Sequence, residues 1–144
     1  MGKKRIVKKP GGSVDQGLKA RALSKSVKRR FDSAVLHVIA SYNNTTITLT
    51  DEKGNVVSSS SAGALGFKGA KKSTPFAAAK VGELIGEKAG QMGIKTVSVV
   101  INGVGSGRES ALRAFVGKGF EVSNIQDRTP NPHNGPRPKK ARRV

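Results

Sequence analysis

The uneven placement of charge is the feature that most constrains how this chain can fold. The 144 residues carry a net charge of +18. Residues 1–30 hold eleven Lys or Arg and one acid, and residues 128–144 hold six Lys or Arg and no acid. Segments so rich in like charge repel themselves and bury little apolar surface. We therefore predict one folded body over residues 31–127, preceded by a basic flexible N-terminal arm and followed by a basic Pro-rich C-terminal tail.

Several classes of site are excluded by composition. The chain has no cysteine, so it can form neither a disulfide nor a thiolate metal site. Its two histidines, His37 and His133, lie far apart among scattered acids, and we expect no metal and no cofactor. No apolar run approaches the roughly 20 residues of a membrane span, and the N-terminus lacks an apolar signal-peptide centre. A soluble cytoplasmic protein is the expected class.

Two basic arms on a near-neutral body predict a polyanionic partner. The body, residues 31–127, holds ten bases and eight acids, so sixteen of the eighteen net charges lie in the arms. Nucleic acid is the favoured partner, because Lys and Arg that neutralise phosphates release counterions. An acidic membrane surface is the weaker alternative, since neither arm has a defined apolar face.

The apolar pattern of the body predicts a β-β-β-α-β-α-β order. In the second strand Ile47 and Leu49 alternate with Thr46, Thr48 and Thr50, as in a half-exposed strand. Strands that alternate with helices late in a chain imply crossovers onto a shared sheet. The expected fold is a ribonuclease-H-like α/β mixed sheet with helices packed on it. The predicted strands are 34–41, 45–51, 56–62, 95–101 and 120–127, and the predicted helices are 75–92 and 108–117.

Local signals fix the longer helix and leave two segments open. Thr74 is the expected N-cap, Pro75 the first helical residue and Gly93 the terminator. Glycines recur within this helix at every fourth position, and tolerated weak helix propensity is favoured over close approach of another backbone. Residues 1–30 are expected to be extended, with helix formation on binding as the alternative for 17–30. The apolar face comprises Ala77, Val81, Leu84, Ile85 and Met92, and the glycine row comprises Gly82, Gly86 and Gly90.

Three loops of the body are candidate RNA contacts, and each also has a simpler explanation. The loop 102–110 joins glycines to Arg108 at a helix start, where phosphate binds well, although a tight turn also needs glycine. The loop 66–73 places lysines beside glycines, as a mobile solvated loop would. Residues 41–46 hold two asparagines that suit either a turn or RNA groups.

The β-β-β-α-β-α-β order is also that of ribonuclease-H-like enzymes, so a nuclease has to be considered. Two-metal hydrolysis requires carboxylates that converge on paired cations. The first strand contains none, and His37 is its only ionisable residue. Asp51 and Glu109 alone cannot build the site, and no nucleophile–base arrangement is evident. We therefore expect no enzymatic activity.

Four segments in order resemble the bacterial-type family of small-subunit ribosomal protein S11. They are "ASYNNT", "KGAKKSTPFAAA", "GVGSGRES" and "DRTPNPHNGPRPKKARRV", the last of which ends the chain. Asn102 and Val104 depart from the family pattern, which often has Lys and Pro there. The first 30 residues match poorly.

The resemblance implies a structural constituent of the small ribosomal subunit. It implies a place on the platform, bridging helices of 16S-type ribosomal RNA, and a contribution to the Shine-Dalgarno cleft that holds messenger RNA. Ribosomal proteins seven and eighteen are the expected neighbours, on a cytoplasmic or an organellar ribosome. A general nucleic-acid-binding protein of nucleoid type is the alternative. The expected RNA-binding residues are Asn43, Asn44, Lys68, Lys71, Lys72, Ser73, Arg108, Arg128, His133, Asn134, Arg137, Lys139, Lys140, Arg142 and Arg143.

The tail also contains a chemically labile step. Glycine after asparagine leaves its backbone nitrogen free to attack the preceding side-chain amide. Asn134 precedes Gly135, so we expect slow isoaspartate formation at Asn134.

Overall fold

Five strands form one mixed sheet in the computed structural model, which describes residues 15–24 and 29–141. The strand order is β3-β2-β1-β4-β5. The first three strands pair antiparallel, whereas β4 runs parallel to both β1 and β5. This arrangement confirms the predicted ribonuclease-H-like α/β fold. The strands are β1 (Ser33–Ala40), β2 (Thr45–Thr50), β3 (Val56–Ser61), β4 (Thr96–Asn102) and β5 (Glu121–Asp127).

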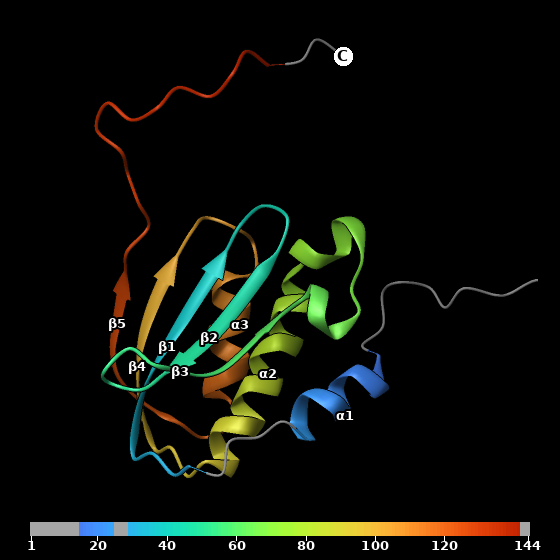
Figure 1. The fold of residues 1–144 in the computed structure, drawn as a ribbon, viewed down its shortest axis with the longest axis vertical. Coiled ribbons are helices and arrows are strands. Elements are labelled where there is room, and N and C mark those ends of the chain that lie inside the picture. Colours follow the sequence, from blue (N-terminus) through green and yellow to red (C-terminus); the bar gives the residue numbers. More distant parts are fainter. Residues whose placement is uncertain (1–14, 25–28, 142–144) are drawn as a thin grey trace, which may run out of the picture.

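Two helices cover one face of this sheet and leave the other face open (Figure 1). They are α2 (Pro75–Gln91) and α3 (Arg108–Val116), and α2 begins as predicted, with the Thr74 hydroxyl accepting the Ala77 N–H at 3.3 Å. Two short 3₁₀ turns, η1 (Gly63–Leu65) and η2 (Gly69–Ser73), lead into α2 where only a loop is predicted.

The core lies between the sheet and the two helices. Strand β1 alternates between faces, so that Leu36 and Val38 are fully buried. Phe115 of α3 closes one side of the core, with its ring stacked on Phe120 at 4.5 Å between centroids. All five predicted apolar positions are buried, four of them within α2 and the fifth, Met92, at its C-cap, which confirms the helical periodicity.

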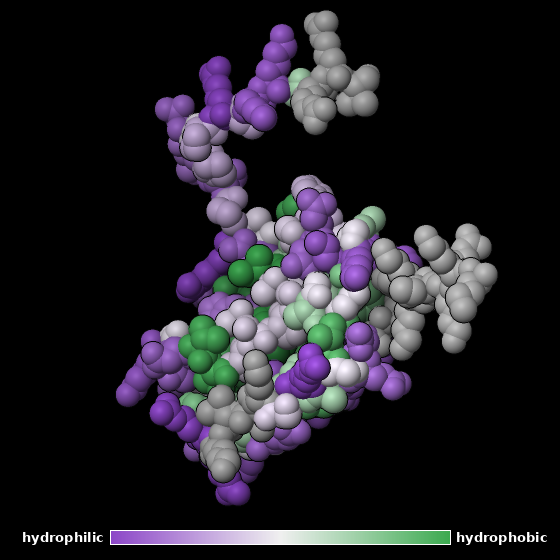
Figure 2. All heavy atoms as spheres, turned by 45° about the vertical axis from the view of Figure 1, so that its right-hand side comes forward, coloured by the Kyte–Doolittle hydropathy of each residue, from purple (hydrophilic) through white to green (hydrophobic). Residues whose placement is uncertain are grey.

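On its three central strands the open face of the sheet carries no acidic side chain and no Lys or Arg. Strands β1, β2 and β4 contain no Lys, Arg, Asp or Glu. On this face His37 pairs with Thr48 on one side and Val100 on the other. Pale and green atoms accordingly dominate the middle of the body in Figure 2, with purple atoms toward its ends. These three strands therefore offer no Lys or Arg to a phosphate on the open face.

One predicted exposure on β2 is wrong. Thr50 lies on the same side as Thr46 and Thr48, but it is buried. Its hydroxyl contacts the Val35 carbonyl at 3.4 Å and the His37 ring nitrogen at 3.2 Å. These partners satisfy the hydroxyl, which allows a polar side chain to be covered.

The interpretation of the glycine row is wrong at Gly82 and holds at Gly90. A Cβ at Gly82 would lie 2.4 Å from the Ala111 carbonyl oxygen, because α3 crosses α2 there. At Gly86 a Cβ would lie 2.8 Å from Cγ and 3.3 Å from Cβ of Lys118, the part of that side chain nearest its backbone. At Gly90 nothing lies within 4 Å. The row thus permits close packing at Gly82, against the backbone of α3, and at Gly86, against the base of the Lys118 side chain, but not at Gly90.

The N-terminal arm departs most from the prediction. Residues Gln16–Ser24 form helix α1 instead of an extended segment. Asp15 caps it by accepting the Gly17 N–H at 3.0 Å, and the Asp15 N–H donates to the Leu65 carbonyl at 3.1 Å. Lys19 of α1 pairs with Glu87 of α2 at 3.1 Å. A cap and these docking contacts stabilise a helix that has no well-separated apolar face.

The two outer glycines of the row give a matched pair for testing the helix contact. Gly82→Ala is expected to lower the free energy of unfolding by about 1–3 kcal/mol through overpacking. Gly90→Ala is expected to raise it by up to about 1 kcal/mol through helix propensity. Urea unfolding of both variants measures the difference. Equal effects of the two substitutions would contradict the close approach of α2 and α3.

Candidate RNA-binding surface

The three candidate loops meet at one end of the sheet. The parallel strands β1 and β4 both end there, so the β1–β2 turn (residues 41–44) lies beside the β4–α3 loop (residues 103–107). The first turn of α2 and the preceding η2 reach the same end, at the top of Figure 1. We call this region the loop end of the sheet.

Ser41 shapes the β1–β2 turn. Its N–H donates to the Asn44 carbonyl at 2.9 Å, and its hydroxyl accepts the Asn44 N–H at 3.1 Å. Asn43 is exposed at the tip. The Asn44 side-chain oxygen is buried and has no hydrogen-bond partner among the described residues. Of the two predicted contacts, Asn43 is therefore the amide that faces solvent.

The glycines of the β4–α3 loop have a structural reason. A Cβ at Gly103 would lie 2.2 Å from the Ala40 carbonyl oxygen, and one at Gly105 would lie 2.3 Å from the Ser41 carbonyl oxygen. The Gly105 N–H donates to the Ala40 carbonyl at 2.9 Å. Gly103 also adopts φ 97°, which favours glycine. The loop packs backbone to backbone on the β1–β2 turn. This packing requires glycine at positions 103 and 105, so a tight turn is sufficient to explain these two residues.

The lysines before α2 form a basic ridge, which comprises Lys68, Lys71 and Lys72. Lys68 and Lys71 are exposed and Lys72 is half-buried. No carboxylate of the described residues lies within ion-pair distance of any of the three. The Ser73 carbonyl accepts the Ser106 hydroxyl at 2.7 Å, which fastens the ridge to the β4–α3 loop. Three unneutralised cations beside a helix N-terminus suit an anionic partner.

Arg108, predicted as a cation for phosphate, takes part in a network within the protein. Its guanidinium pairs with Asp127 of β5 at 2.6 Å and donates to the Gly103 carbonyl at 2.9 Å. The Thr129 hydroxyl donates to Asp127 at 2.6 Å and accepts the Gly103 N–H at 3.2 Å. Hydrogen bonds from Thr129, followed by that from Arg108, hold the pKa of Asp127 well below its usual range. The network fixes the point where the tail leaves the sheet.

The tail itself leaves the body. Residues 130–141 have no regular secondary structure and are exposed throughout. Figures 1 and 2 show the tail standing off the folded body as a largely hydrophilic thread. Arg128 contacts Gln126 at its base. The remaining predicted residues of this segment are His133, Asn134, Arg137, Lys139 and Lys140, all exposed, whereas Arg142 and Arg143 lie outside the described residues.

Residues 34–143 match the family model of ribosomal protein S11. The chain belongs to the ribosomal protein S11 family. The match spans the folded body from β1 onward and most of the tail, and it confirms the resemblance seen in the four sequence segments. Membership identifies a structural constituent of the small ribosomal subunit that binds ribosomal RNA. The family is structural rather than enzymatic, and its members reside on the ribosome.

Neither a metal-binding cluster nor a helix suited to crossing a membrane occurs in the described part of this S11 family member. No three His, Cys, Asp or Glu side chains among the described residues gather as a metal site. No helix within the described ranges is long and apolar enough to cross a membrane. At the centre of β1, His37 occupies the place where a nuclease of this fold requires a carboxylate.

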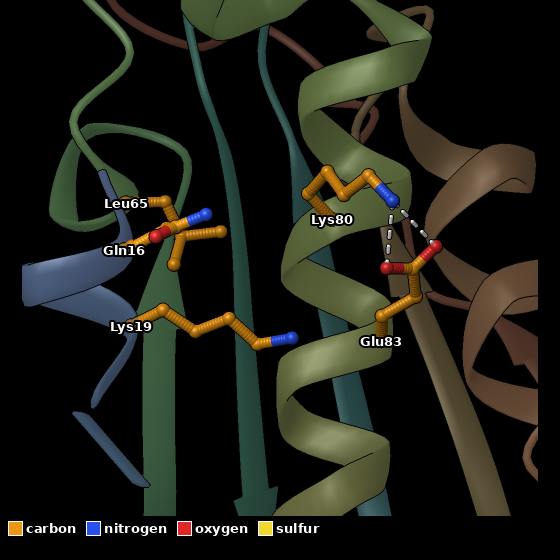
Figure 3. A pocket seen from close by; sticks show the side chains of 5 residues that line it. All are labelled: Gln16, Lys19, Leu65, Lys80 and Glu83. Atoms are coloured by element: carbon orange, nitrogen blue, oxygen red, sulfur yellow. Dashed lines mark hydrogen bonds and ion pairs between the residues drawn. The ribbon is translucent and has the colours of Figure 1, made fainter. Parts of the chain in front are cut away.

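A cavity of about 240 Å³ lies between α1 and α2 (Figure 3). Gln16, Lys19, Leu65, Lys80 and Glu83 line it. Lys80 is already paired with Glu83 at 2.9 Å and Lys19 with Glu87. The cavity is smaller than most small-molecule pockets and its cations are neutralised, so the S11 family member has no evident ligand site there.

Sequence reasoning missed the network around Asp127. The spacing Asp-x-Thr at positions 127 and 129 is a signal for it, because an aspartate commonly accepts the N–H two residues on. The Thr129 N–H indeed donates to Asp127 at 3.0 Å. The pairing of Asp127 with Arg108 depends on the β4–β5 register and has no local signal. RNA contact at the predicted residues stays a prediction.

The depressed pKa of Asp127 predicts how the tail anchor responds to acid. A carboxyl whose folded pKa is lowered contributes stability above its unfolded value, near 3.8, and loses it as pH falls through the folded value. The anchor is therefore expected to stay intact through neutral and mildly acidic pH. Thr129→Val removes the hydroxyl hydrogen bond to Asp127, which is the largest cause of the lowered pKa. NMR titration of the Asp127 carboxyl should show a higher midpoint in this variant, and an unchanged midpoint would contradict the assigned cause.

The chain holds two Asn-Gly steps in opposite environments, which sharpens the isoaspartate prediction. Asn134 is exposed with φ 61°, whereas Gly103 after Asn102 has its N–H donated to Thr129. Aged wild-type protein is expected to form isoaspartate at Asn134 and not at Asn102. Peptide mass spectrometry with electron-transfer dissociation distinguishes the two. Absence of isoaspartate at Asn134, or equal amounts at both sites, would disprove the prediction.

Proposed function

We propose that this chain bridges ribosomal RNA helices on the platform of the small subunit. In this proposal the folded body sets position, while the loop end and the tail neutralise phosphates where RNA helices converge. The chain acts by binding, without catalysis. Support comes from family membership together with the placement of unpaired cations outside the three central strands β1, β2 and β4, which carry no Lys, Arg, Asp or Glu.

The observation that carries the proposal is the anchored but free tail. The network of Arg108, Asp127 and Thr129 fixes its base, and residues 130–141 contact nothing that would keep them on the body. Four prolines exclude helix and ladder pairing and limit the entropy lost on ordering. Fifteen extended residues span up to about 50 Å, enough to follow RNA well beyond the body.

The proposed position of the chain within the small subunit is taken from its resemblance to the S11 family. We propose that the chain helps to form the Shine-Dalgarno cleft for messenger RNA, with ribosomal proteins seven and eighteen as its neighbours. The proposal covers cytoplasmic ribosomes, and an organellar ribosome offers the same chemistry. Its RNA-contacting residues within the described part are Asn43, the basic ridge, Ser73, Arg128 and the exposed tail cations, with Arg108 in a positioning role.

Binding to small-subunit ribosomal RNA tests the function directly. The full chain is expected to protect a defined set of positions in the protein-free RNA and to co-sediment with reconstituted small subunits. Competition with duplex DNA of equal phosphate content distinguishes the nucleoid alternative. Equal affinity for the DNA, together with no defined RNA footprint, would support that alternative over the ribosomal one.

The tail cations give the sharpest variant. Removal of residues 137–144 deletes Arg137, Lys139, Lys140, Arg142 and Arg143. Because the described part of this segment is exposed, unfolding stability is expected to change by less than about 0.5 kcal/mol. The slope of log affinity against log salt should fall by up to about 4.5 if all five meet phosphates.

A full-length variant with the same five residues replaced by Gln is the matched control. It keeps the length and the prolines, so an equal loss assigns the effect to charge. A large fall in melting temperature on truncation, or an unchanged salt slope, would contradict the role of the tail.

A further inference from the structure

Exposed apolar side chains gather at the loop end of the sheet. Tyr42 is 78% exposed, Val104 58% and Phe76 57%. They come from the β1–β2 turn, the β4–α3 loop and the first turn of α2, the elements that also form or adjoin the basic ridge. Single exposed apolar residues are common, but a group of them among unpaired cations calls for a partner.

Tyr42 is the member of this group with no internal role. Phe76 packs edge-on against Phe67, with ring centroids 6.1 Å apart, and Lys80 lies 5.7 Å from its centroid. Among the described residues, no ring contact and no hydrogen bond engages Tyr42. Its ring therefore presents an aromatic surface to solvent.

The backbone that carries Tyr42 is nevertheless fixed. Ser41 closes the turn through its own N–H and hydroxyl, and the Gly105 N–H holds the end of β1 at Ala40. Gly105 also packs against the Ser41 carbonyl oxygen. Val104 directly precedes Gly105 in the chain, and Tyr42 directly follows Ser41. A tyrosine on a rigid turn has two rotatable side-chain bonds, so holding its ring against a ligand costs little entropy.

We propose that Tyr42 is a stacking site for an unpaired RNA base, with Val104 and the Asn43 amide at its edge. Every base offers a face on which an aromatic ring stacks, and single-stranded loops and bulges expose such faces. The exposed Lys68 and Lys71 supply phosphate attraction at the same end of the sheet. This inference rests on the proposed RNA-binding function and deepens it, because it names an unpaired base where the cations alone require only phosphate.

A protein surface is the competing partner for an exposed tyrosine. The lysines around the loop end favour a polyanion over an apolar protein surface. The open face of the sheet, formed by the strands away from the loop end, is not part of the proposal. Experiments that compare base-bearing with base-free polyanions decide between the two partners.

The chain offers a direct optical reporter. Tyr42 is its only tyrosine, and it has no tryptophan. An unstructured single-stranded RNA oligonucleotide is expected to quench the tyrosine emission, after correction for absorbance with free N-acetyl-tyrosinamide. Heparin, a polyanion without bases, and a fully paired RNA duplex should bind and leave the emission nearly unchanged. Equal quenching by heparin, or no quenching by RNA that binds, would overturn the stacking site.

Affinity measurements on small-subunit ribosomal RNA complete the test. Tyr42→Ala is expected to weaken binding roughly 5- to 150-fold with an unchanged salt slope, because stacking neutralises no phosphate. Tyr42→Phe keeps the ring and should bind like wild type. Val56→Ala removes a side chain that is 64% exposed at the opposite end of the sheet and controls for loss of apolar surface.

The outcomes separate the inference from the function beneath it. Wild-type affinity for Tyr42→Ala, with normal RNA binding by the wild type, overturns the stacking site alone. The stacking site is also overturned if Val56→Ala or Tyr42→Phe lowers the affinity for ribosomal RNA as much as Tyr42→Ala does. Failure of the wild type to bind ribosomal RNA overturns the proposed function, and the inference with it.

Discussion

The contact between the glycine loop and the end of β1 is the constraint on which the rest of the loop end depends. The loop approaches so closely that no side chain fits at Gly103 or Gly105, and a backbone hydrogen bond to Ala40 closes the gap. In the same loop the Gly103 carbonyl accepts a hydrogen bond from the Arg108 guanidinium, and the Gly103 N–H donates to the Thr129 hydroxyl. The β1–β2 turn, the start of α3 and the base of the tail are thus held through one short backbone segment.

Much of the fold could be predicted from the sequence, because its signals are local and repeated. The alternation in β2 and the Thr74-Pro75 start of α2 depend on neighbouring residues; the start of α2 appears as predicted, and the alternation holds from Thr46 to Leu49. Helix α1 could not be predicted in the same way. Its apolar residues form no clear stripe, and its support comes from Leu65 and Glu87, which are distant in sequence.

The candidate site was predictable in its parts and not in its connections. The basic ridge and the tail are cationic runs that any reading of the sequence finds. Whether Arg108 is free or paired depends on Asp127, 19 residues away and brought close by parallel pairing of β4 and β5. The glycine at position 82 likewise meets Ala111 only through the crossing of two helices. Such contacts are tertiary, so residue spacing alone does not encode them.

The exposed tail also has a consequence for how quickly this protein finds its RNA. A folded body diffuses as a compact particle, but a cationic thread attached at one fixed point enlarges the volume in which a first encounter can occur. Disordered or extended charged segments raise association rates in this way, since capture precedes docking. Because the anchor at Asp127 fixes the direction in which the thread leaves the sheet, a captured RNA strand would be drawn toward the loop end. The tail would then act as a guide during subunit assembly as well as a contact in the finished particle.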